Sequence, residues 1–311
     1  MNSGILAALG AFVLWGFLPV YWKSVDQTPA TEILSHRMVW SLLFILVLLL
    51  FRTQWSWITK ARTQPKVLLN AFGCSLLLGS NWMIYIWSVN AGYIVEASLG
   101  YYINPLLNVV LGVFFLQERL RPWQWFAITV AATGVLYLTL SYGQVPWIAI
   151  GLALTFGFYG LLRKQSQLES MEGLALESSF LTLPAFLYLL YLGYQGSGSF
   201  GNLSISHDLL LAGTGIATAL PLLLFAYSAR RISLTALGLL QYIGPSIQLA
   251  LGVWIYNEPF DQQRIVGFSI IWSALLIYTL EGIYRRRAHR VKLEKPTGVV
   301  NNRGEIKKIE T

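Results

Sequence analysis

The 311-residue chain is 55% hydrophobic and 12% charged, and its mean hydropathy is +0.57. A soluble domain of this length could not keep so much apolar surface in water, whereas lipid accepts an apolar exterior. The formal net charge of +8 does not indicate nucleic-acid binding, because the cations lie at the ends of apolar segments and in the C-terminal tail. The single cysteine, Cys74, excludes a disulfide framework and a cysteine metal cluster.

Ten apolar segments follow one another along most of the chain. A helix rises about 1.5 Å per residue, so about 20 mostly apolar residues cross a hydrocarbon layer of about 30 Å. Segments this long are helices rather than barrel strands, which need only about 10 residues. The sequence therefore predicts an all-α, polytopic membrane protein whose ten transmembrane helices cover 4–22, 33–51, 66–88, 95–116, 122–140, 145–162, 174–194, 208–229, 234–256 and 264–284.

The distribution of cations predicts the orientation of these helices. With a cytoplasmic N-terminus, the even-numbered connections and the tail carry nearly all cations, Arg163 and Lys164 among them, and only Lys23, Arg37 and Arg264 fall elsewhere. The positive-inside rule then places both termini in the cytoplasm. The tail is polar and basic, and we expect it to be disordered and close to the lipid surface. The first segment lacks a basic region before it and a cleavage site after it, so we expect it to be retained.

The last five segments partly repeat the first five. Identical residues at an offset of 140 include Pro, Gly and Glu, which composition alone matches less readily than Leu, Ile or Val. They pair Tyr102 with Tyr242, Pro105 with Pro245, Gly112 with Gly252 and Glu118 with Glu258. Because five is odd, the second unit enters the membrane from the opposite side. The sequence thus predicts two inverted five-helix repeats, 1–142 and 143–284, followed by the basic disordered cytoplasmic tail, 285–311.

Several stretches resemble the RarD-type proteins of the EamA branch of the drug/metabolite transporter superfamily. They are WGFLPVYWKSV (15–25), EILSHRMVWS (32–41), NWMIYIWSVNAGYIVEASLGYYINPLLNVVLGVFFLQERL (81–120), FGFYGLLRK (156–164) and LGLLQYIGPSIQLALGVWIYNEPF (237–260). The resemblance covers essentially the whole chain before the tail. It implies ten helices, two cytoplasmic ends, a bacterial inner membrane and a permease function. It brings no established binding or catalytic residues and leaves the substrate open.

Neutral polar side chains deep in the segments predict a solute pathway. Polar groups in hydrocarbon are costly and normally face the bundle interior or a water-filled path. Asn104 and Asn108 share a helix face, and the repeat aligns Asn108 with Gln248 and Tyr101 with Gln241. Such groups offer donors and acceptors to an uncharged or zwitterionic solute, or alternatively bond to neighbouring helices. The predicted lining is Asn81, Tyr101, Asn104, Asn108, Gln241 and Gln248.

Three ionisable residues are candidates for a proton site or a gate: His36, Arg37 and Glu177. Glu32 and His36 are four residues apart, so the carboxylate could stabilise an imidazolium that titrates near neutral pH. Glu177 aligns with His36 at an offset of 141. The alternative places Glu32, His36 and Arg37 at headgroup depth, with Arg37 snorkelling and Glu32 solvated in its loop. It leaves Glu177 exposed to water near a helix start. Glu118 and Glu258, at segment ends, are expected to anchor the topology.

Prolines and aromatic residues add to the predicted pathway. Pro105 and Pro245 lie near the middle of equivalent segments, where each lacks an amide donor and clashes with the preceding turn. We therefore expect kinks in the fourth and ninth helices beside the cavity. Trp15 and Trp82 lie inside segments and either pack in the core or stack on a solute, whereas Trp22 belongs to an interfacial belt.

The predicted function is secondary transport. The chain has no Walker A loop, H-E-x-x-H, Rossmann or G-x-S-x-G motif, so we expect neither an enzyme nor an ATP-driven pump, and no cofactor or metal. Inverted repeats supply outward-open and inward-open states, and a small metabolite, amino acid or drug would move by alternating access, with export slightly favoured. An intramembrane enzyme, a receptor and a passive channel are the alternatives. We expect a small-molecule solute and membrane lipid as partners and no nucleic acid, and leave a homodimer open.

Overall fold

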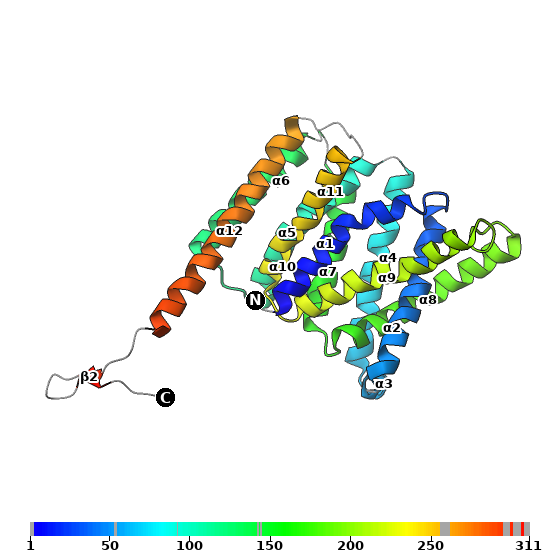
Figure 1. Ribbon diagram of the computed structural model, residues 1–311, viewed down its shortest axis with the longest axis horizontal. Helices are drawn as coiled ribbons and strands as arrows, with labels where there is room; N and C mark the ends of the chain where they lie inside the picture. Colours follow the sequence, from blue (N-terminus) through cyan, green and yellow to red (C-terminus); the bar gives the residue numbers. More distant parts are fainter. Residues whose placement is uncertain are drawn as a thin grey trace.

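The computed structural model describes residues 3–52, 55–91, 93–141, 143, 145–255, 262–294, 299–300 and 306–307. Within these residues the chain is almost entirely helical (Figure 1). The elements are α1 (Ser3–Lys23), α2 (Ala30–Arg52), α3 (Ser56–Thr63), α4 (Pro65–Asn90), α5 (Ile94–Leu116), α6 (Pro122–Ser141), α7 (Trp147–Gln165), α8 (Ser170–Gln195), α9 (Ile205–Ala229), α10 (Leu234–Gln241), α11 (Ile243–Trp254), α12 (Gln262–Glu294), β1 (Val299–Val300) and β2 (Ile306–Lys307).

Each predicted membrane segment coincides with helix. Nine helical stretches among the described residues are long and apolar enough to cross a membrane, with α10 and α11 counted together as one. The exception is α7, which has 19 residues and ends with the polar sequence Arg163, Lys164 and Gln165. These three residues lower the mean hydropathy of a helix that is otherwise as apolar as its neighbours.

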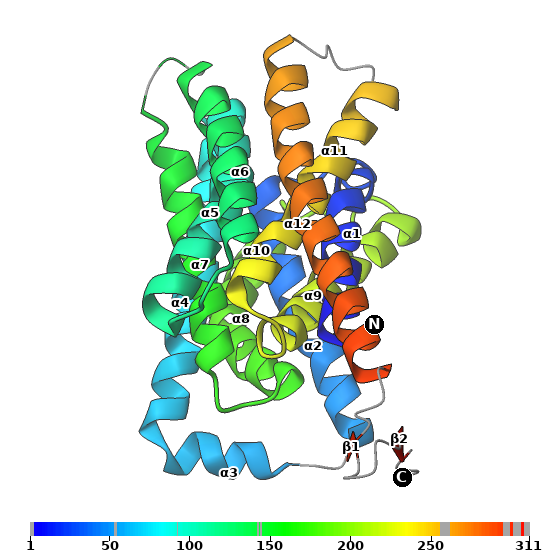
Figure 2. The same ribbon diagram turned by 90° about the vertical axis from the view of Figure 1, so that its left-hand side faces the viewer.

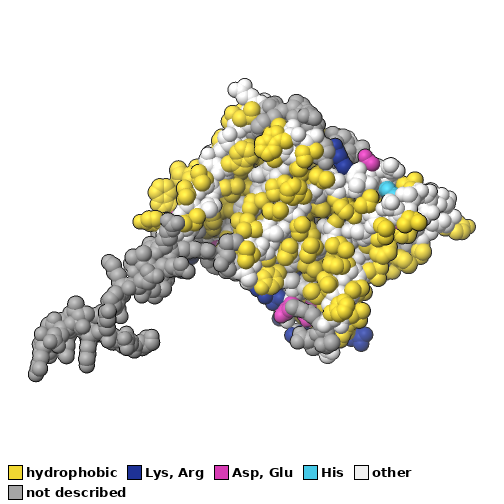
Figure 3. Space-filling view, viewed as in Figure 1, with side chains coloured by type: hydrophobic (Ala, Val, Ile, Leu, Met, Phe, Trp, Pro, Cys, Tyr) yellow, Lys and Arg dark blue, Asp and Glu magenta, His cyan; other side chains and the backbone are white. Residues whose placement is uncertain are grey.

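The outer surface of the bundle is apolar. Figure 3 shows hydrophobic side chains over most of one face, with Lys, Arg, Asp and Glu near its upper and lower edges. Phe51 is 82% exposed, and Phe114 and Leu140 are each 71% exposed. Water would disfavour so large an apolar surface, whereas hydrocarbon matches it. The chain is therefore a multi-pass membrane protein.

Helices of the first half pack mainly against helices of the second half. α5 contacts α7 and α10, and α1 contacts α9, α10 and α11. α2 packs on α8 and α9, and α4 packs on α7 and α8. The last helix of each half, α6 and α12, pair with each other at one side of the bundle (Figure 1). The interior is thus an interface between the two halves.

Two features of the chain depart from the predicted segments. α3 forms within the connection between the second and third segments and runs across the end of α4, with Trp57 and Ala61 buried (Figure 2). α12 continues to Glu294, ten residues past the predicted end, because the residues after Tyr284 are mostly good helix formers. The tail predicted as disordered therefore begins as helix, and β1 and β2 form an antiparallel pair farther along it.

The two repeat-related prolines have different surroundings. The ninth predicted segment is divided at Tyr242 into α10 and α11, three residues before Pro245, which cannot donate a backbone hydrogen bond. α5 is continuous through Pro105. The ninth segment is therefore divided near its proline, whereas the fourth is one helix, and the kinks expected at both prolines stay a prediction.

Glu118 accepts hydrogen bonds from the first residues of α10. Its Oε1 accepts a hydrogen bond from the Leu234 amide at 2.6 Å, and its Oε2 accepts from the Thr235 amide at 3.0 Å and from Thr235 Oγ1 at 2.7 Å. A carboxylate at a helix N-terminus satisfies free amides and complements the helix dipole. Glu118 is thus a cap as well as a residue at the end of a segment. Its repeat partner, Glu258, lies outside the described residues.

Candidate solute pathway

A cavity of about 210 Å³ lies at the interface between the two halves. Its lining comes from α1, α2, α4 and α5 of the first half and from α7, α9, α10 and α11 of the second. Trp15, Trp82 and Phe156 supply large apolar walls, and the rings of Trp15 and Phe156 meet edge to face with 5.8 Å between their centroids. The cavity therefore combines aromatic surfaces with the polar groups described next.

The structure places five of the six predicted lining residues on this cavity; they are Asn81, Tyr101, Asn104, Gln241 and Gln248. The sixth, Asn108, lies behind them. Its Nδ2 donates to Asn104 Oδ1 and to Gln241 Oε1, both at 3.0 Å. Asn108 therefore connects α5 to α10 and positions two of the lining amides.

The lining amides also join helices to one another. Asn81 Nδ2 donates to the Leu152 carbonyl at 2.9 Å, and Asn104 Nδ2 donates to the Ala153 carbonyl at 3.1 Å. Gln248 Nε2 donates to the Trp15 carbonyl at 3.1 Å. Interhelical hydrogen bonding and cavity lining, which the sequence presents as alternatives, thus occur in the same side chains. Held in this way, the amides have few alternative conformations.

Arg37 also lines the cavity. Its Nε donates to Thr218 Oγ1 at 2.9 Å, and its guanidinium carbon lies 4.7 Å from the Trp22 ring centroid and 5.1 Å from that of Trp82. Arg37 therefore points into the bundle. Trp22, which the sequence assigns to an interfacial belt, instead forms part of the same wall. Thr218 was missed because an isolated threonine in an apolar segment gives no sequence signal.

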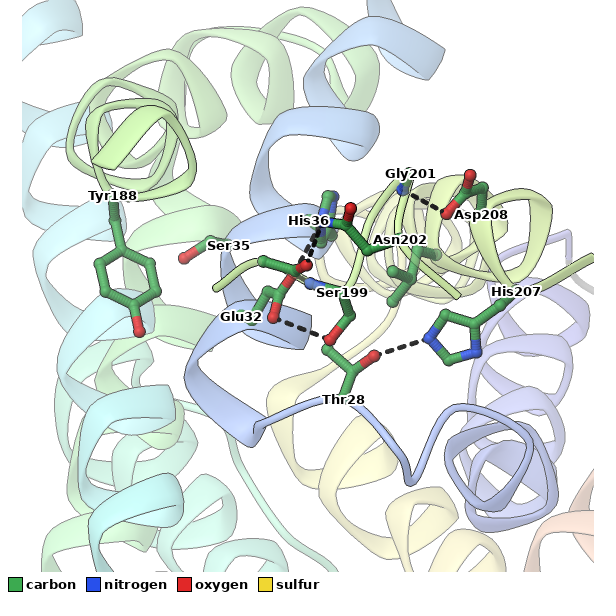
Figure 4. Close-up of polar contacts among 12 residues, drawn as sticks. Thr28, Glu32, Ser35, His36, Tyr188, Ser199, Gly201, Asn202, His207 and Asp208 are labelled. Carbon is green, nitrogen blue, oxygen red and sulfur yellow. Dashed lines mark hydrogen bonds and ion pairs between the residues drawn. The ribbon is translucent and has the colours of Figure 1, made fainter. Parts of the chain in front are cut away.

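His36 lies outside the cavity lining, in a buried polar cluster at one end of the bundle (Figure 4). His36 Nε2 is 3.7 Å from Glu32 Oε1, and that oxygen accepts from the Ser199 amide at 2.7 Å. Glu32 Oε2 accepts from Ser199 Oγ at 3.1 Å. Glu32 is 1% exposed and His36 5%, so the expectation that Glu32 is solvated in its loop is wrong.

The same cluster joins two connections that are distant in sequence. Thr28 Oγ1 lies 2.7 Å from His207 Nε2, and the Gly201 amide donates to Asp208 Oδ1 at 2.8 Å (Figure 4). The connection between α1 and α2 therefore contacts the start of α9, and the connection between α8 and α9 contacts the start of α2. Ser199 and His207 were not predicted as partners of this site, because their contacts span more than 160 residues.

Glu177 forms a buried ion pair with Arg163. Arg163 Nη1 donates to Glu177 Oε1 at 2.8 Å, and Arg163 Nη2 donates to the Ser170 carbonyl at 3.3 Å. Arg163 is 0% exposed and Glu177 1% exposed, so the alternative of a water-exposed Glu177 is wrong. A Cβ at Gly173 would lie 2.1 Å from Arg163 Nη1, so this position must be glycine for the arginine to fit. Neither residue of the pair lines the cavity.

Known proteins are similar to this chain in sequence and in fold. A model of the EamA-like transporter family matches residues 2–140. Protein RarD of Streptomyces exfoliatus is 44% identical, covering 94% of this chain and 93% of that protein. An uncharacterized transporter of Vibrio cholerae is 44% identical over 93% of this chain and 96% of its own length, and protein RarD of Escherichia coli K12 is 42% identical over 92% and 97%.

A solved crystal structure superposes on the chain with a TM-score of 0.69, covering 90% of this chain and 98% of the other at 20% identity. That level of identity supports a shared fold. The curated relatives, by contrast, are similar in sequence over almost the whole length of both chains, and three of them are named as transporters. The chain therefore belongs to the RarD-type branch of the EamA-like transporter family and is a membrane transporter.

Proposed function

We propose that this transporter is a secondary permease that carries a small organic solute across the bacterial inner membrane by alternating access. The observation that carries the proposal is the cavity, whose aromatic walls and amide groups come from both halves of the chain. A site between two halves that can rock against each other is the geometry alternating access requires. Coupling would come from an ion gradient or from the gradient of the solute itself, and we favour export over uptake.

The packing supports two inverted five-helix repeats. Exchanging the halves turns the α5–α7 contact into a contact of α10 and α11 with α1, and it turns α4–α8 into α9–α2. The pairs α2–α8 and α6–α12 exchange into themselves. Each of these contacts is present, as expected for two copies of one unit related by a two-fold axis. Two features depart from this symmetry among the described residues: the interruption at Tyr242, and α3, which has no counterpart between α8 and α9.

The buried polar cluster supports a count of ten crossings. Thr28 contacts His207, so the connections on either side of this contact lie at the same end of the bundle. Between them the chain passes through α2, α4, α5, α6, α7 and α8. An even number of crossings returns the chain to the same side, and the number is even only when α7 crosses the membrane too. Together with the cation distribution, an even count supports our proposal that both termini are cytoplasmic.

Flux into proteoliposomes tests transport against the other functions. A carrier gives saturable movement of an unchanged solute, a passive channel gives movement without saturation, and an enzyme alters the solute. Thermal-shift screening of metabolites against the purified protein selects the solute, because a ligand of the folded state raises the unfolding temperature.

A matched pair of glycines tests whether the cavity is the route. A Cβ at Gly244, which lines the cavity, would make only an ordinary contact at 3.5 Å, whereas a Cβ at Gly193 would meet nothing within 4 Å. Gly244→Leu should therefore occupy the cavity and reduce flux at least about tenfold, while Gly193→Leu should leave flux unchanged. Equal flux in both variants would place the route elsewhere.

A further inference from the structure

Arg37 presents an unpaired part of its guanidinium to the cavity. One nitrogen, Nε, donates to Thr218 Oγ1 at 2.9 Å. Within the described part of the chain, the two terminal nitrogens donate no hydrogen bond, although the side chain lines the cavity. Arginine stays protonated in proteins and carries its donors in a rigid planar fork. The N–H bonds of both terminal nitrogens are therefore available to a solute.

Two other cations inside the bundle have oxygen partners. Arg163 is paired with Glu177 at 2.8 Å, and Lys164 Nζ donates to the carbonyls of Ala229 and Ile232. Among the described residues, the contacts of the Arg37 guanidinium are one neutral hydroxyl and two aromatic faces. A cation at membrane depth is costly unless it is paired or serves a function.

The positive charge of Arg37 is not balanced by any acidic side chain among the described residues that line the cavity. Of these residues, Arg37 is the only one with a charged side chain. Gln241 adds a second donor to the lining, because its Oε1 is occupied by Asn108 and its Nε2 makes no hydrogen bond to the described residues. A pocket with one fixed positive charge and low-dielectric walls attracts anions and repels cations.

The remaining walls suit an aromatic or similarly apolar body. Trp15, Trp82 and Phe156 border the cavity, and the guanidinium carbon of Arg37 lies over the rings of Trp22 and Trp82 at cation–π distance. An apolar cavity of about 150 Å³ accommodates benzene. The 210 Å³ found here therefore leaves space for one ring and a short acidic substituent.

We propose that the solute is a small organic anion whose carboxylate pairs with the terminal nitrogens of Arg37 while its aromatic or apolar body lies against the tryptophan walls. The inference rests on the proposed function. The amides alone suggest an uncharged or zwitterionic solute, whereas Arg37 favours an acid. A planar carboxylate matches the guanidinium fork in a bidentate arrangement, which is stronger than a bond between neutral groups. Arg37 is thus the residue that selects for charge.

Three probes of one shape and different charge test the inference: phenylacetate, phenylacetamide and phenethylamine. Binding is measured by calorimetric titration of the full-length protein in detergent at pH 7. Phenylacetate should bind at least about tenfold more tightly than either of the others, because only it forms a charge-assisted pair. Equal affinities, tighter binding of the amide or amine, or no binding of phenylacetate would overturn the proposal. This comparison needs no variant, so it does not depend on the folding of a mutant.

Variants then assign the preference to Arg37. Arg37→Gln should lower phenylacetate affinity at least about tenfold and leave the amide unaffected, whereas Arg37→Lys keeps the charge without the fork and should lower it less. Arg231→Gln is the matched control, because Arg231 also stacks on an aromatic ring, with its guanidinium carbon 3.4 Å from the Tyr227 centroid, but lies outside the cavity. An anion preference that survives Arg37→Gln would remove Arg37 from the site.

Flux separates failure of this inference from failure of the proposed function. Proteoliposomes are assayed with labelled phenylacetate and with any neutral or cationic solute that the thermal-shift screen selects. Phenylacetate that binds through Arg37 and yet never crosses would support the anion site and contradict transport through it. Saturable flux of a cation that is insensitive to Arg37→Gln would support transport and overturn the anion site.

Discussion

At the scale of single residues, buried charges carry most of what the sequence could not reveal. Arg163 follows an apolar segment, and a cation in that position has the same pattern whether it is hydrated or paired. Its partner, Glu177, lies one helix later, and the space for the pair depends on Gly173. Arg37 and the neutral amides were predictable as candidates, because polar groups are rare in such segments. Their arrangement around one cavity required the packing of helices from both halves.

The Arg163–Glu177 pair should contribute strongly to stability when only one partner is removed. Arg163→Gln or Glu177→Gln alone leaves an uncompensated buried charge and should cost about 3 to 5 kcal/mol. The double variant should cost less than the sum of the two, which a double-mutant cycle measured by chemical unfolding in micelles will show. The pair Arg121–Glu281 is the control. Its arginine side chain is 49% exposed, although its glutamate side chain is 8% exposed, so water screens the charge and the pair should contribute about 0 to 1 kcal/mol. Additive losses at Arg163 and Glu177 would mean that the pair does not act as a unit.

His36 remains the candidate for pH-dependent transport, although it lies outside the cavity. It faces Glu32 at 3.7 Å, with Asp208 and His207 as the next titratable groups around it. If it carries the coupling proton, His36→Gln should flatten the profile of flux against pH between about pH 5 and 8, where an unperturbed imidazole changes charge. A profile that is unchanged in a folded, active variant would instead favour Glu177 as the proton site, or uncoupled transport.

At the scale of helices, hydropathy located the segments because lipid forces each apolar stretch to satisfy its own backbone hydrogen bonds. Hydropathy could not show that the helix is divided near Pro245 and continuous at Pro105. Both remove one donor, but the helix is divided only near Pro245, where α10 approaches α5 closely at Gly238. The amphipathic α3 was missed because its eight residues are too few to cross a membrane and include two cations, a pattern typical of a connection. Only the structure shows that Trp57 is buried.

Gly238 should be essential to the contact between α10 and α5. A Cβ there would lie 2.6 Å from the Pro105 carbonyl oxygen and 2.9 Å from Asn108 Cβ, so Gly238→Ala must push the helices apart. We expect a loss of about 1 to 3 kcal/mol, measured by thermal unfolding, together with weaker solute binding because Gln241 moves with α10. Gly193→Ala is the control and should stabilise slightly, since alanine is the better helix former and the position is open. Unchanged stability in Gly238→Ala would show that the two helices can separate without loss.

At the scale of the whole molecule, the sequence repeat predicted two inverted halves, and the helix contacts support this arrangement. The side of the membrane on which each connection lies is a separate question, which an experiment can decide. The contact between Thr28 and His207 requires an even number of crossings between them, and this number is even only if α7 crosses, although α7 is not among the nine described stretches that are long and apolar enough to do so. Asp26 and Gln167 occupy equivalent positions in the two repeats at an offset of 141. Inversion requires that these two positions face opposite sides of the membrane.

Cysteine labelling decides both questions in one series. Cys74 is the only cysteine and is buried, so Cys74→Ser gives a background into which single cysteines are introduced at three exposed positions: Asp26, Ser197 and Gln167. A membrane-impermeant maleimide applied to intact cells should label Asp26→Cys and Ser197→Cys, and should reach Gln167→Cys only in inside-out vesicles. The first pair should lie on one side because six predicted membrane crossings, α2 and α4 to α8, separate the two positions. Gln167 should lie on the other side because α8 separates it from Ser197. Labelling of Asp26→Cys and Ser197→Cys from opposite sides would mean that α7 does not cross. Labelling of Asp26→Cys and Gln167→Cys from the same side would exclude inverted repeats. It would also exclude the symmetry on which the proposed alternating access depends.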